Sequence, residues 1–327
     1  MLDYDKEHWR ISSGELRQRQ SLPLRMKIIH TLGVIHQWYE SWDGEVAVAF
    51  SGGKDSTVLL DIIRKIYPDV PAVFADTGLE YPEIKEFVKR QSNVTIVKPK
   101  IPFHKIIQDY GYPIISKKVS FMVSMCQRPH QNNIKSRTLY LTGVNSHGEK
   151  SGFVIPKKYR YLVNAPFKIS SRCCDFIKKY PLSKYEQQTK RQLFVGTMAS
   201  DSRLRENAYL QTGCNTFIGK HQISRPLAIW TEQDTLQYCI ENDIEICPIY
   251  GNIEKTETGF KCSKMDRTGC IFCLFGIHME SEPNRFQSMA ITHPNQYNYC
   301  INKLKMGEIM DYIGIKYEPN LKSGRWN

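Results

Sequence analysis

One short segment constrains this chain more than any other: the glycine-rich hexapeptide at residues 51–56. Residues 46–50, which precede it, are apolar, as in a buried strand, and residues 57–66 have the spacing of a helix that stops before Pro68. A strand that runs through such a turn into a helix presents free amides and the positive end of the helix dipole to an anion. We therefore expect a phosphate-binding loop made of Ser51, Gly52, Gly53, Lys54, Asp55 and Ser56.

Further strands and helices are predicted to follow this loop in alternation. Residues 72–75, 94–97 and 193–196 have the length and composition of strands, and a helix is expected from Pro82. Strands that alternate with helices at this spacing form a parallel sheet covered by helices. The sequence thus predicts an α/β domain over residues 44–220, with a parallel twisted sheet flanked by helices.

Two segments flank this predicted domain, and one segment inside it is irregular. Residues 1–43 are expected to form an N-terminal helical segment, and residues 221–327 a small cysteine-containing helical unit. Residues 112–168 are basic and contain three glycines, Gly143, Gly148 and Gly152. The segment as a whole has no clear pattern, and its glycines predict a hairpin or a mobile loop where they lie.

The hexapeptide has a counterpart in a known class of enzymes. Its spacing is too short for the G-x-x-x-x-G-K-[ST] loop of the P-loop NTPases. It resembles the PP-loop of the ATP pyrophosphatases, which cleave ATP between the α and β phosphates. The resemblance implies that residues 51–56 bind ATP, that Lys54 and Asp55 are catalytic, and that Asp55 helps to hold Mg²⁺. A tight turn without a ligand is the alternative.

Residues 74–83 narrow the family, because they resemble the Asp-Thr-Gly segment of the phosphoadenosine phosphosulfate (PAPS) reductases. In that family the segment lies at the end of the second strand, beside the adenosine. Open parallel sheets bind ligands at that end of their strands. The resemblance implies that Asp76, Thr77 and Gly78 bind the nucleotide, and a solvated turn aspartate is the alternative.

Residues 196–205 are similar to the arginine-containing phosphate segment of the same family. Met198 stands where the family has its first arginine, and Asp201 stands where glutamate is usual. Arg205 keeps the last arginine position. The resemblance implies that Arg205 faces phosphate or sulfate and acts in catalysis, whereas a solvated helix arginine is the alternative.

Two later segments also resemble that family. Residues 225–234 are similar to its Pro-Leu-x-x-Trp helix start, and residues 248–250 to its Pro-Leu-Tyr segment. Thr231 and Asp234 have the spacing of an N-cap and its N3 partner. We expect a structural role for both segments.

Five of the ten cysteines stand in positions that indicate metal or redox chemistry. Adjacent cysteines do not easily chelate one zinc ion, but they can bind different irons of one cluster. Bacterial adenylylsulfate reductases carry a Cys-Cys pair and a distal Cys-x-x-Cys on a [4Fe–4S] cluster. The resemblance implies that the cluster ligands here are Cys173, Cys174, Cys270 and Cys273. The alternatives are zinc or a cluster on Cys262, Cys270, Cys273 and one member of the pair, and free redox-active thiols.

The overall composition narrows the class of protein. The formal net charge of +12 indicates a polyanionic partner such as nucleic acid, or else scattered solvated lysines. No run of 18 apolar residues predicts a membrane span, and residues 1–10 lack the apolar core of a signal peptide. We expect a cytoplasmic protein without a membrane partner.

Three functions remain open from the sequence. The sulfonucleotide reductases end in a tail with a catalytic cysteine, whereas residues 301–327 contain none. This favours an AMP-forming enzyme that adenylates DNA or tRNA and transfers sulfur to it, as in Dnd-type DNA phosphorothioation or tRNA thiolation. Its sulfur would come from a donor such as a cysteine desulfurase. The alternatives are a reductase that releases sulfite from PAPS or adenylylsulfate, and a non-catalytic nucleotide-binding module.

Overall fold

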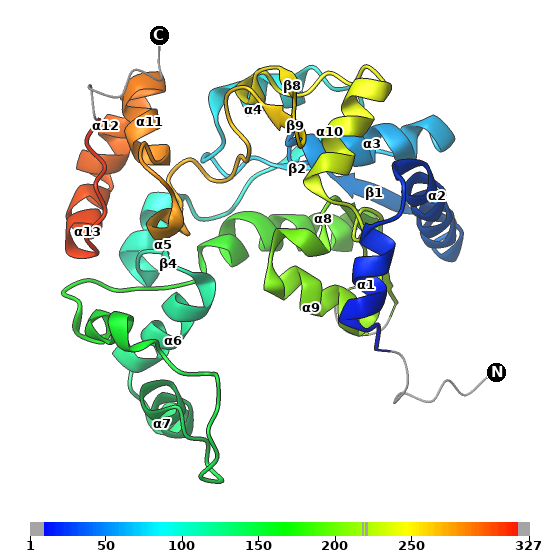
Figure 1. The fold of residues 1–327 in the computed structure, drawn as a ribbon. Coiled ribbons are helices and arrows are strands. Elements are labelled where there is room, and N and C mark those ends of the chain that lie inside the picture. The colour runs from blue at the N-terminus through cyan, green and yellow to red at the C-terminus, as the bar shows by residue number, and fades with distance from the viewer. Residues whose placement is uncertain (1–9, 218, 220–221, 320–327) are drawn as a thin grey trace. The chain divides into compact units, whose positions relative to one another are not determined.

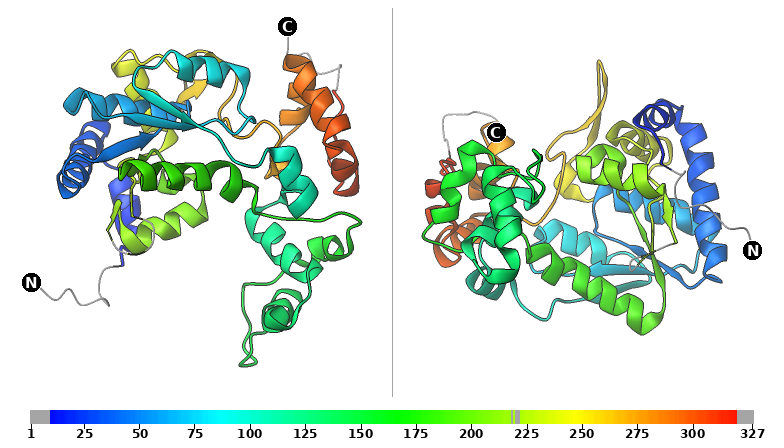
Figure 2. Two further views of the ribbon diagram at one scale, coloured as in Figure 1. Left: turned by 180° about the vertical axis from the view of Figure 1, so that it is seen from behind. Right: turned by 90° about the horizontal axis from the view of Figure 1, so that it is seen from below.

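The computed structural model describes residues 10–217, 219 and 222–319, and its chain divides into two compact units. Unit 1 consists of Met1–Pro99 and Lys178–Gly269, and unit 2 of Lys100–Ile177 and Cys270–Asn327. Figures 1 and 2 show that each unit is made from two separate stretches of chain. The boundaries expected at residues 43 and 220 differ from this division, because a sequence pattern does not show where a chain leaves one unit and later returns to it.

Unit 1 contains a six-stranded sheet with the strand order β3-β2-β1-β5-β7-β6. Neighbouring strands are parallel except β6, which is antiparallel to β7. The predicted α/β fold with a mainly parallel sheet is thereby confirmed. The strands are β1 (Val46–Ala49), β2 (Ala72–Ala75), β3 (Val94–Val97), β5 (Gln192–Val195), β6 (Asn215–Thr216) and β7 (Ile223–Ser224).

Helices cover the sheet of unit 1 because its strands are apolar on both faces. On one face, Ala47, Val73 and Leu193 pack with Tyr185 of α8. Figure 1 shows α3 and α10 on the opposite side of the sheet from α8. The helices of unit 1 are α1 (Ser13–Gln20), α2 (Leu24–Ser41), α3 (Lys54–Ile66), α4 (Pro82–Lys89), α8 (Tyr180–Thr189), α9 (Arg203–Thr212) and α10 (Glu232–Glu241). A hairpin of β8 (Ile253–Thr256) and β9 (Gly259–Cys262) follows α10.

The start of α10 is fixed by two buried contacts to α2. Thr231 and Asp234 form the predicted capping box, with both the Thr231 amide and hydroxyl 2.7 Å from Asp234 Oδ2. Lys27 of α2 makes a buried ion pair with the same carboxylate, at 2.6 Å. Trp230 Nε1 donates to Thr31 Oγ1 at 2.9 Å. These contacts hold the first turn of α10, and with it Glu232, in a fixed position.

Unit 2 is mostly helical. Its short parallel ladder pairs β4 (Ile114–Ile115) with β10 (Leu274–Phe275) and joins the two stretches of chain. Its α-helices are α5 (Phe103–Tyr110), α6 (Lys117–Gln127), α7 (Ile134–Thr142), α11 (Arg285–Thr292), α12 (Pro294–Asn298) and α13 (Met306–Tyr312). Among the described residues, no helix is both long enough and apolar enough to cross a membrane.

Residues 112–168 contain a hairpin at the glycines, as predicted, but also two helices that were not predicted, α6 and α7. Val119, Met122, Val123 and Cys126 of α6 are buried at the i, i+3, i+4 and i+7 spacing of an amphipathic helix. The pattern is not obvious in the sequence because basic residues flank it, Lys117 and Lys118 before it and Arg128 after it. The hairpin follows α7 and is closed by a hydrogen bond of 2.8 Å from the Ser151 amide to the Gly143 carbonyl.

Candidate active site

A cavity of about 440 Å³ lies at the carboxyl ends of β1, β2 and β5 in unit 1. Ala49, Ala75 and Val195, the last residues of these strands, form part of its wall. Five residues of the predicted phosphate loop also line it: Ser51, Gly53, Lys54, Asp55 and Ser56. The carboxyl ends of parallel strands are where open α/β sheets bind ligands, and the cavity volume suits a small molecule.

The loop turns sharply and leaves the start of α3 open. Gly53 is the N-cap of α3, and among the described residues no side chain caps it. Gly52 has φ 71°, and a Cβ atom there would come within 2.8 Å of Val88 and 2.9 Å of Ile84 on α4. Glycine is therefore required at position 52 by both conformation and space. The uncapped first-turn amides of α3 are suited to an anion.

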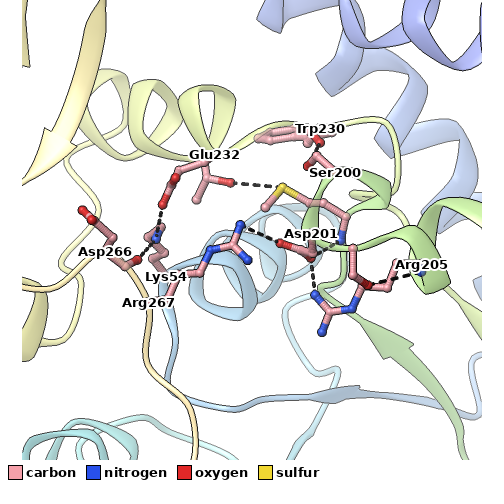
Figure 3. Close-up of polar contacts among 11 residues, drawn as sticks. Lys54, Ser200, Asp201, Arg205, Trp230, Glu232, Asp266 and Arg267 are labelled. Carbon is pink, nitrogen blue, oxygen red and sulfur yellow. Dashed lines mark hydrogen bonds and ion pairs between the residues drawn. The ribbon is translucent and has the colours of Figure 1, made fainter. Parts of the chain in front are cut away.

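Lys54 is held inside this site by acceptors from two later segments, as Figure 3 shows. Its side chain is buried, and its Nζ lies 2.6 Å from Glu232 Oε1. The same Nζ donates to the backbone carbonyl of Asp266 and lies 5.3 Å from the ring centroid of Tyr250. The predicted catalytic lysine thus already has a carboxylate partner.

Asp55 is the acidic residue of the loop, and one of its carboxylate oxygens is buried. Burial raises the pKa of its carboxyl group to about 6; Lys54 opposes this rise, and Asp201 and Glu232 add to it. Its Oδ1 atom is buried and has no hydrogen-bond partner among the described residues. A buried carboxylate oxygen without a partner is costly, so a cation at this oxygen would be stabilising.

Asp201 forms ion pairs with two arginines at the cavity. Its side chain is 6% exposed and forms ion pairs with Arg205 and, at 3.4 Å, with Arg267. The Met198 amide donates to its Oδ2 at 2.9 Å. Figure 3 shows both guanidinium groups directed at this one carboxylate. Arg205, predicted from the resemblance, and Arg267, which was not predicted, therefore lie together on the cavity wall.

Several polar residues of the cavity wall were not predicted to belong to the site, among them Glu232, Tyr250, Arg267 and Thr268. The sequence predicts a structural role for Tyr250, yet its hydroxyl lies 2.6 Å from Thr268 Oγ1, at the cavity. Arg267 and Thr268 belong to the segment between β9 and Cys270. In the sequence these two residues are notable only because they lie close to Cys270, and the cysteines indicate metal or redox chemistry and not phosphate binding.

The predicted nucleotide-binding residues Asp76, Thr77 and Gly78 follow β2 but are not among the residues that line the cavity. Asp76 pairs with Lys85 at 2.8 Å. Burial acts to raise the pKa of Asp76, but hydrogen bonds from Lys85 and the Gly78 amide outweigh it and lower the pKa. Thr77 donates to Glu80 from its amide and its hydroxyl, at 3.0 and 2.6 Å, and Glu80 itself lines the cavity.

The four predicted cluster ligands all belong to unit 2. Cys173 and Cys174 stand at the start of a helix, with their sulfur atoms 3.9 Å apart. Cys270 and Cys273 form a tight turn in which the Cys273 amide donates to the Cys270 carbonyl at 3.0 Å. The contact with Cys174, burial, and the nearby thiols of Cys273 and Cys270 raise the pKa of Cys173 well above its usual range. The fold therefore brings the pair and the turn into one electrostatic neighbourhood.

This neighbourhood fits an iron–sulfur cluster in its donor chemistry, because thiolates are the usual ligands of such clusters. Arg172 and Arg285 lie beside it, and Arg285 Nη1 donates to the Cys273 carbonyl at 3.2 Å. Among the described residues, no group of three or more His, Cys, Asp or Glu side chains has the geometry to hold a single metal ion. The cluster and its four ligands remain a prediction.

Cys262, the alternative to one member of the Cys173–Cys174 pair, belongs to unit 1 as the last residue of β9. It is buried, and burial raises the pKa of its thiol. The charged groups that act on it are Lys54, Asp266, Glu232 and Asp55, all at the cavity or beside it. Its described environment is therefore that of the phosphate loop.

Comparison with known proteins identifies relatives that match this chain over only part of their own length. An uncharacterized protein of Methanocaldococcus jannaschii is 23% identical over 283 residues, which are 84% of this chain and 52% of that protein. The adenosine 5'-phosphosulfate reductase of Geobacillus kaustophilus is 32% identical over 107 residues, which are 33% of this chain and 40% of the enzyme. The chain thus spans at most about half the length of these relatives.

Solved structures match only loosely. The phosphoadenylyl-sulfate reductase of Candida auris matches 73% of this chain and 90% of its own, with 12% identity and a TM-score of 0.38. A tRNA thiolase of Methanococcus maripaludis that holds a [4Fe–4S] cluster matches 88% of this chain and 82% of its own, with 13% identity and a TM-score of 0.33.

A family profile matches this chain in two segments. The phosphoadenosine phosphosulfate reductase domain matches residues 45–113 and 135–274, which include the phosphate loop, both arginine positions at Asp201 and all four predicted cluster ligands. The match covers well over half of the chain and confirms the resemblance drawn from its motifs. The chain belongs to the phosphoadenosine phosphosulfate reductase domain family.

Proposed function

We propose that this chain is an adenine-nucleotide-dependent enzyme that activates a nucleic-acid group as its adenylate and transfers sulfur to it. The observation that carries the proposal is the cavity in unit 1, where the uncapped start of α3, Lys54 and two arginines face one space. A triphosphate supplies the anion for which this site has donors. Membership in a family that acts on adenine nucleotides supports the same ligand.

The charges at the cavity support an exchange of partners on binding. Lys54 is paired with Glu232, and Arg205 and Arg267 are paired with Asp201. Phosphate oxygens would take over these cations, since guanidinium and ammonium groups bind phosphate strongly. The carboxylates released in this way, together with Asp55, offer oxygen ligands to Mg²⁺.

The reaction has two displacements. An oxygen of the acceptor, either a base carbonyl or a backbone phosphate, attacks the α-phosphorus; the bond from that phosphorus to the bridging oxygen breaks, and pyrophosphate leaves. Lys54 and the first-turn amides of α3 stabilise the charge that develops on the phosphates. Sulfur at the oxidation level of sulfide then displaces AMP from the activated group, without net oxidation or reduction. A [4Fe–4S] cluster on Cys173, Cys174, Cys270 and Cys273 would supply an iron–sulfur centre in unit 2 for the sulfur half of the chemistry.

A second function is favoured by one observation. Several relatives with a named activity are adenosine 5'-phosphosulfate reductases, whose matches cover between about a quarter and about two thirds of this chain. In that case the cavity would bind a sulfonucleotide, whose phosphate and sulfate oxygens need the same amides and cations, and the product would be sulfite.

The test is product analysis with protein purified under anaerobic conditions. We expect AMP and pyrophosphate to form from ATP only when tRNA or DNA is added, and the acceptor to gain sulfur when a cysteine desulfurase and a reductant are supplied. Lys54→Met should lower turnover about 100-fold or more, whereas Lys89→Met, at an exposed lysine of α4, should leave it unchanged. Release of sulfite from adenylylsulfate with thioredoxin, without acceptor-dependent pyrophosphate, would establish the reductase instead. Tight ATP binding with neither activity would show a non-catalytic module.

A further inference from the structure

The positive charge of this chain is concentrated in one segment of unit 2. Residues 112–168 contain ten lysine or arginine residues and a single acidic residue, Glu149. The rest of the chain contains 35 basic and 32 acidic residues, so it is close to neutral. The overall charge of +12 is therefore mostly a local property of the segment that forms α6, α7 and the hairpin after α7. Scattered solvated lysines do not explain such a distribution.

These basic side chains are available to a partner. Nine of the ten are exposed, and among the described residues none of the ten forms an ion pair with a carboxylate. This differs from the cavity of unit 1, where Lys54, Arg205 and Arg267 each pair with a carboxylate. Unpaired cations that repel one another are costly to gather unless an anion comes between them.

Aromatic rings lie among these cations. Phe121 of α6 and Phe153 of the hairpin are 46% and 57% exposed. Lys118 Nζ lies 4.7 Å from the ring centroid of Phe153, and the rings of Phe121 and Tyr140 meet edge to face at 6.1 Å. Lys117 and Lys118 precede Phe121 by four and three residues on α6, so the three share one side of the helix. We call Lys117, Lys118, Phe121, Tyr140 and Phe153 the basic–aromatic surface.

The scaffold under this surface is fixed. Gln127, at the end of α6, donates to the Phe167 carbonyl at 3.0 Å and accepts from the Ile169 amide at 2.9 Å. Lys118 also donates to the Gly152 carbonyl at 2.9 Å, which ties the hairpin to the start of α6. A rigid surface loses less conformational entropy when it binds a ligand.

We propose that the basic–aromatic surface binds a nucleic-acid strand with unpaired bases. Exposed lysines pair with the backbone phosphates, and exposed rings stack on bases that are not already stacked in a duplex. The proposal rests on the proposed function only for the identity of the strand as the sulfur acceptor. Binding itself requires neither ATP nor cluster chemistry.

The test measures binding of the full chain, without nucleotide, by fluorescence anisotropy. The probes are a single-stranded RNA and a single-stranded DNA of about twenty nucleotides, a blunt duplex of the same length, and phosphatidylserine vesicles. We expect at least one single strand to bind more tightly than the duplex, with an affinity that falls as salt rises. The better of the two strands identifies the class of acceptor. Preference for the duplex or for the vesicles would overturn the proposal.

Three variants make the test specific. K117E/K118E should weaken binding about tenfold or more and reduce its salt dependence. K255E/K303E, which reverses two exposed lysines outside the segment, should change binding less than about twofold. F153L should weaken binding about five- to tenfold, whereas F153Y, which keeps a ring that stacks, should bind like the original protein. Equal effects of the two charge reversals, or of the two Phe153 variants, would contradict the surface.

The outcomes separate this proposal from the proposed function. If the full chain binds no single strand but still releases pyrophosphate when the acceptor is added, the proposed surface is wrong and the proposed nucleotide chemistry stands. If strand binding depends on Lys117, Lys118 and Phe153 but the protein releases no pyrophosphate, the proposed surface is supported and the proposed adenylation is wrong.

Discussion

The phosphate loop of unit 1 and the four predicted cluster ligands of unit 2 treat charge in opposite ways. At the loop, Lys54 has Glu232 as its partner, and Asp201 pairs with Arg205 and Arg267. At the cysteines, thiol groups lie near one another, and these neighbours and burial together disfavour the Cys173 thiolate. The loop site is electrostatically balanced before a ligand arrives, whereas the cysteine site needs an added cationic centre to become thiolate. The two regions should therefore fail in different ways when they are changed.

The largest expected effect concerns that cationic centre. Cys270→Ala removes one predicted thiolate ligand and should abolish the bound iron and acid-labile sulfide, because a cluster with three ligands is rarely retained through purification. ATP affinity should stay within about twofold, since the nucleotide is expected to bind in unit 1. Iron and sulfide assays joined to ATP titration check this. Cys126→Ala, at a buried cysteine elsewhere in unit 2, is the control and should keep its iron.

The second prediction is the reverse of the first: a change in unit 1 should affect the nucleotide reaction and leave the iron content unchanged. Lys54→Met should lower nucleotide turnover about 100- to 1,000-fold, because it removes a cation aimed at developing phosphate charge. The iron content should be unchanged. Should Lys54→Met lose the cluster, or Cys270→Ala lose ATP binding, the two sites would have to be treated as one.

The third prediction concerns pH. In the folded chain the pKa of Asp55 is about 6, against 3.8 for an ordinary aspartate. The folded state therefore holds this proton more tightly, so stability should fall as pH rises from about 4 to about 6, by at most about 3 kcal/mol. Asp55→Asn should lack this component. Urea unfolding of both proteins across that range measures the difference, and identical pH profiles would show that Asp55 is not buried as the structure has it.

The smallest expected effect is at the residue that the sequence motifs missed. Arg267→Ala should weaken ATP binding about tenfold, because it removes one charged donor from the cavity while Arg205 remains on Asp201. Calorimetric titration with ATP measures this loss. Arg203→Ala is the matched control, since Arg203 is exposed and does not line the cavity. A loss at Arg203 that equals the loss at Arg267 would place the phosphates outside the described cavity.

Local patterns predicted the elements of unit 1 well. The strands expected at residues 72–75 and 94–97 are β2 and β3, and the helix expected from Pro82 is α4. Each was marked by a short apolar run with glycine or proline beside it, which is a local signal. The helices of residues 117–142 were missed because polar flanks obscured a correct amphipathic spacing. The family resemblance was found from short motifs and is confirmed by the family profile.

The sequence by itself determined the phosphate loop, because a strand, a glycine turn and a helix start are contiguous and need no distant partner to define them. Only the tertiary structure decided what surrounds that loop. Glu232, Tyr250 and Arg267 come within reach because the chain returns to unit 1 after an excursion of 78 residues, and no local pattern encodes that return. The same physical reason places Cys173 and Cys270 in one unit although almost a hundred residues separate them, since contacts of this kind depend on how whole elements pack.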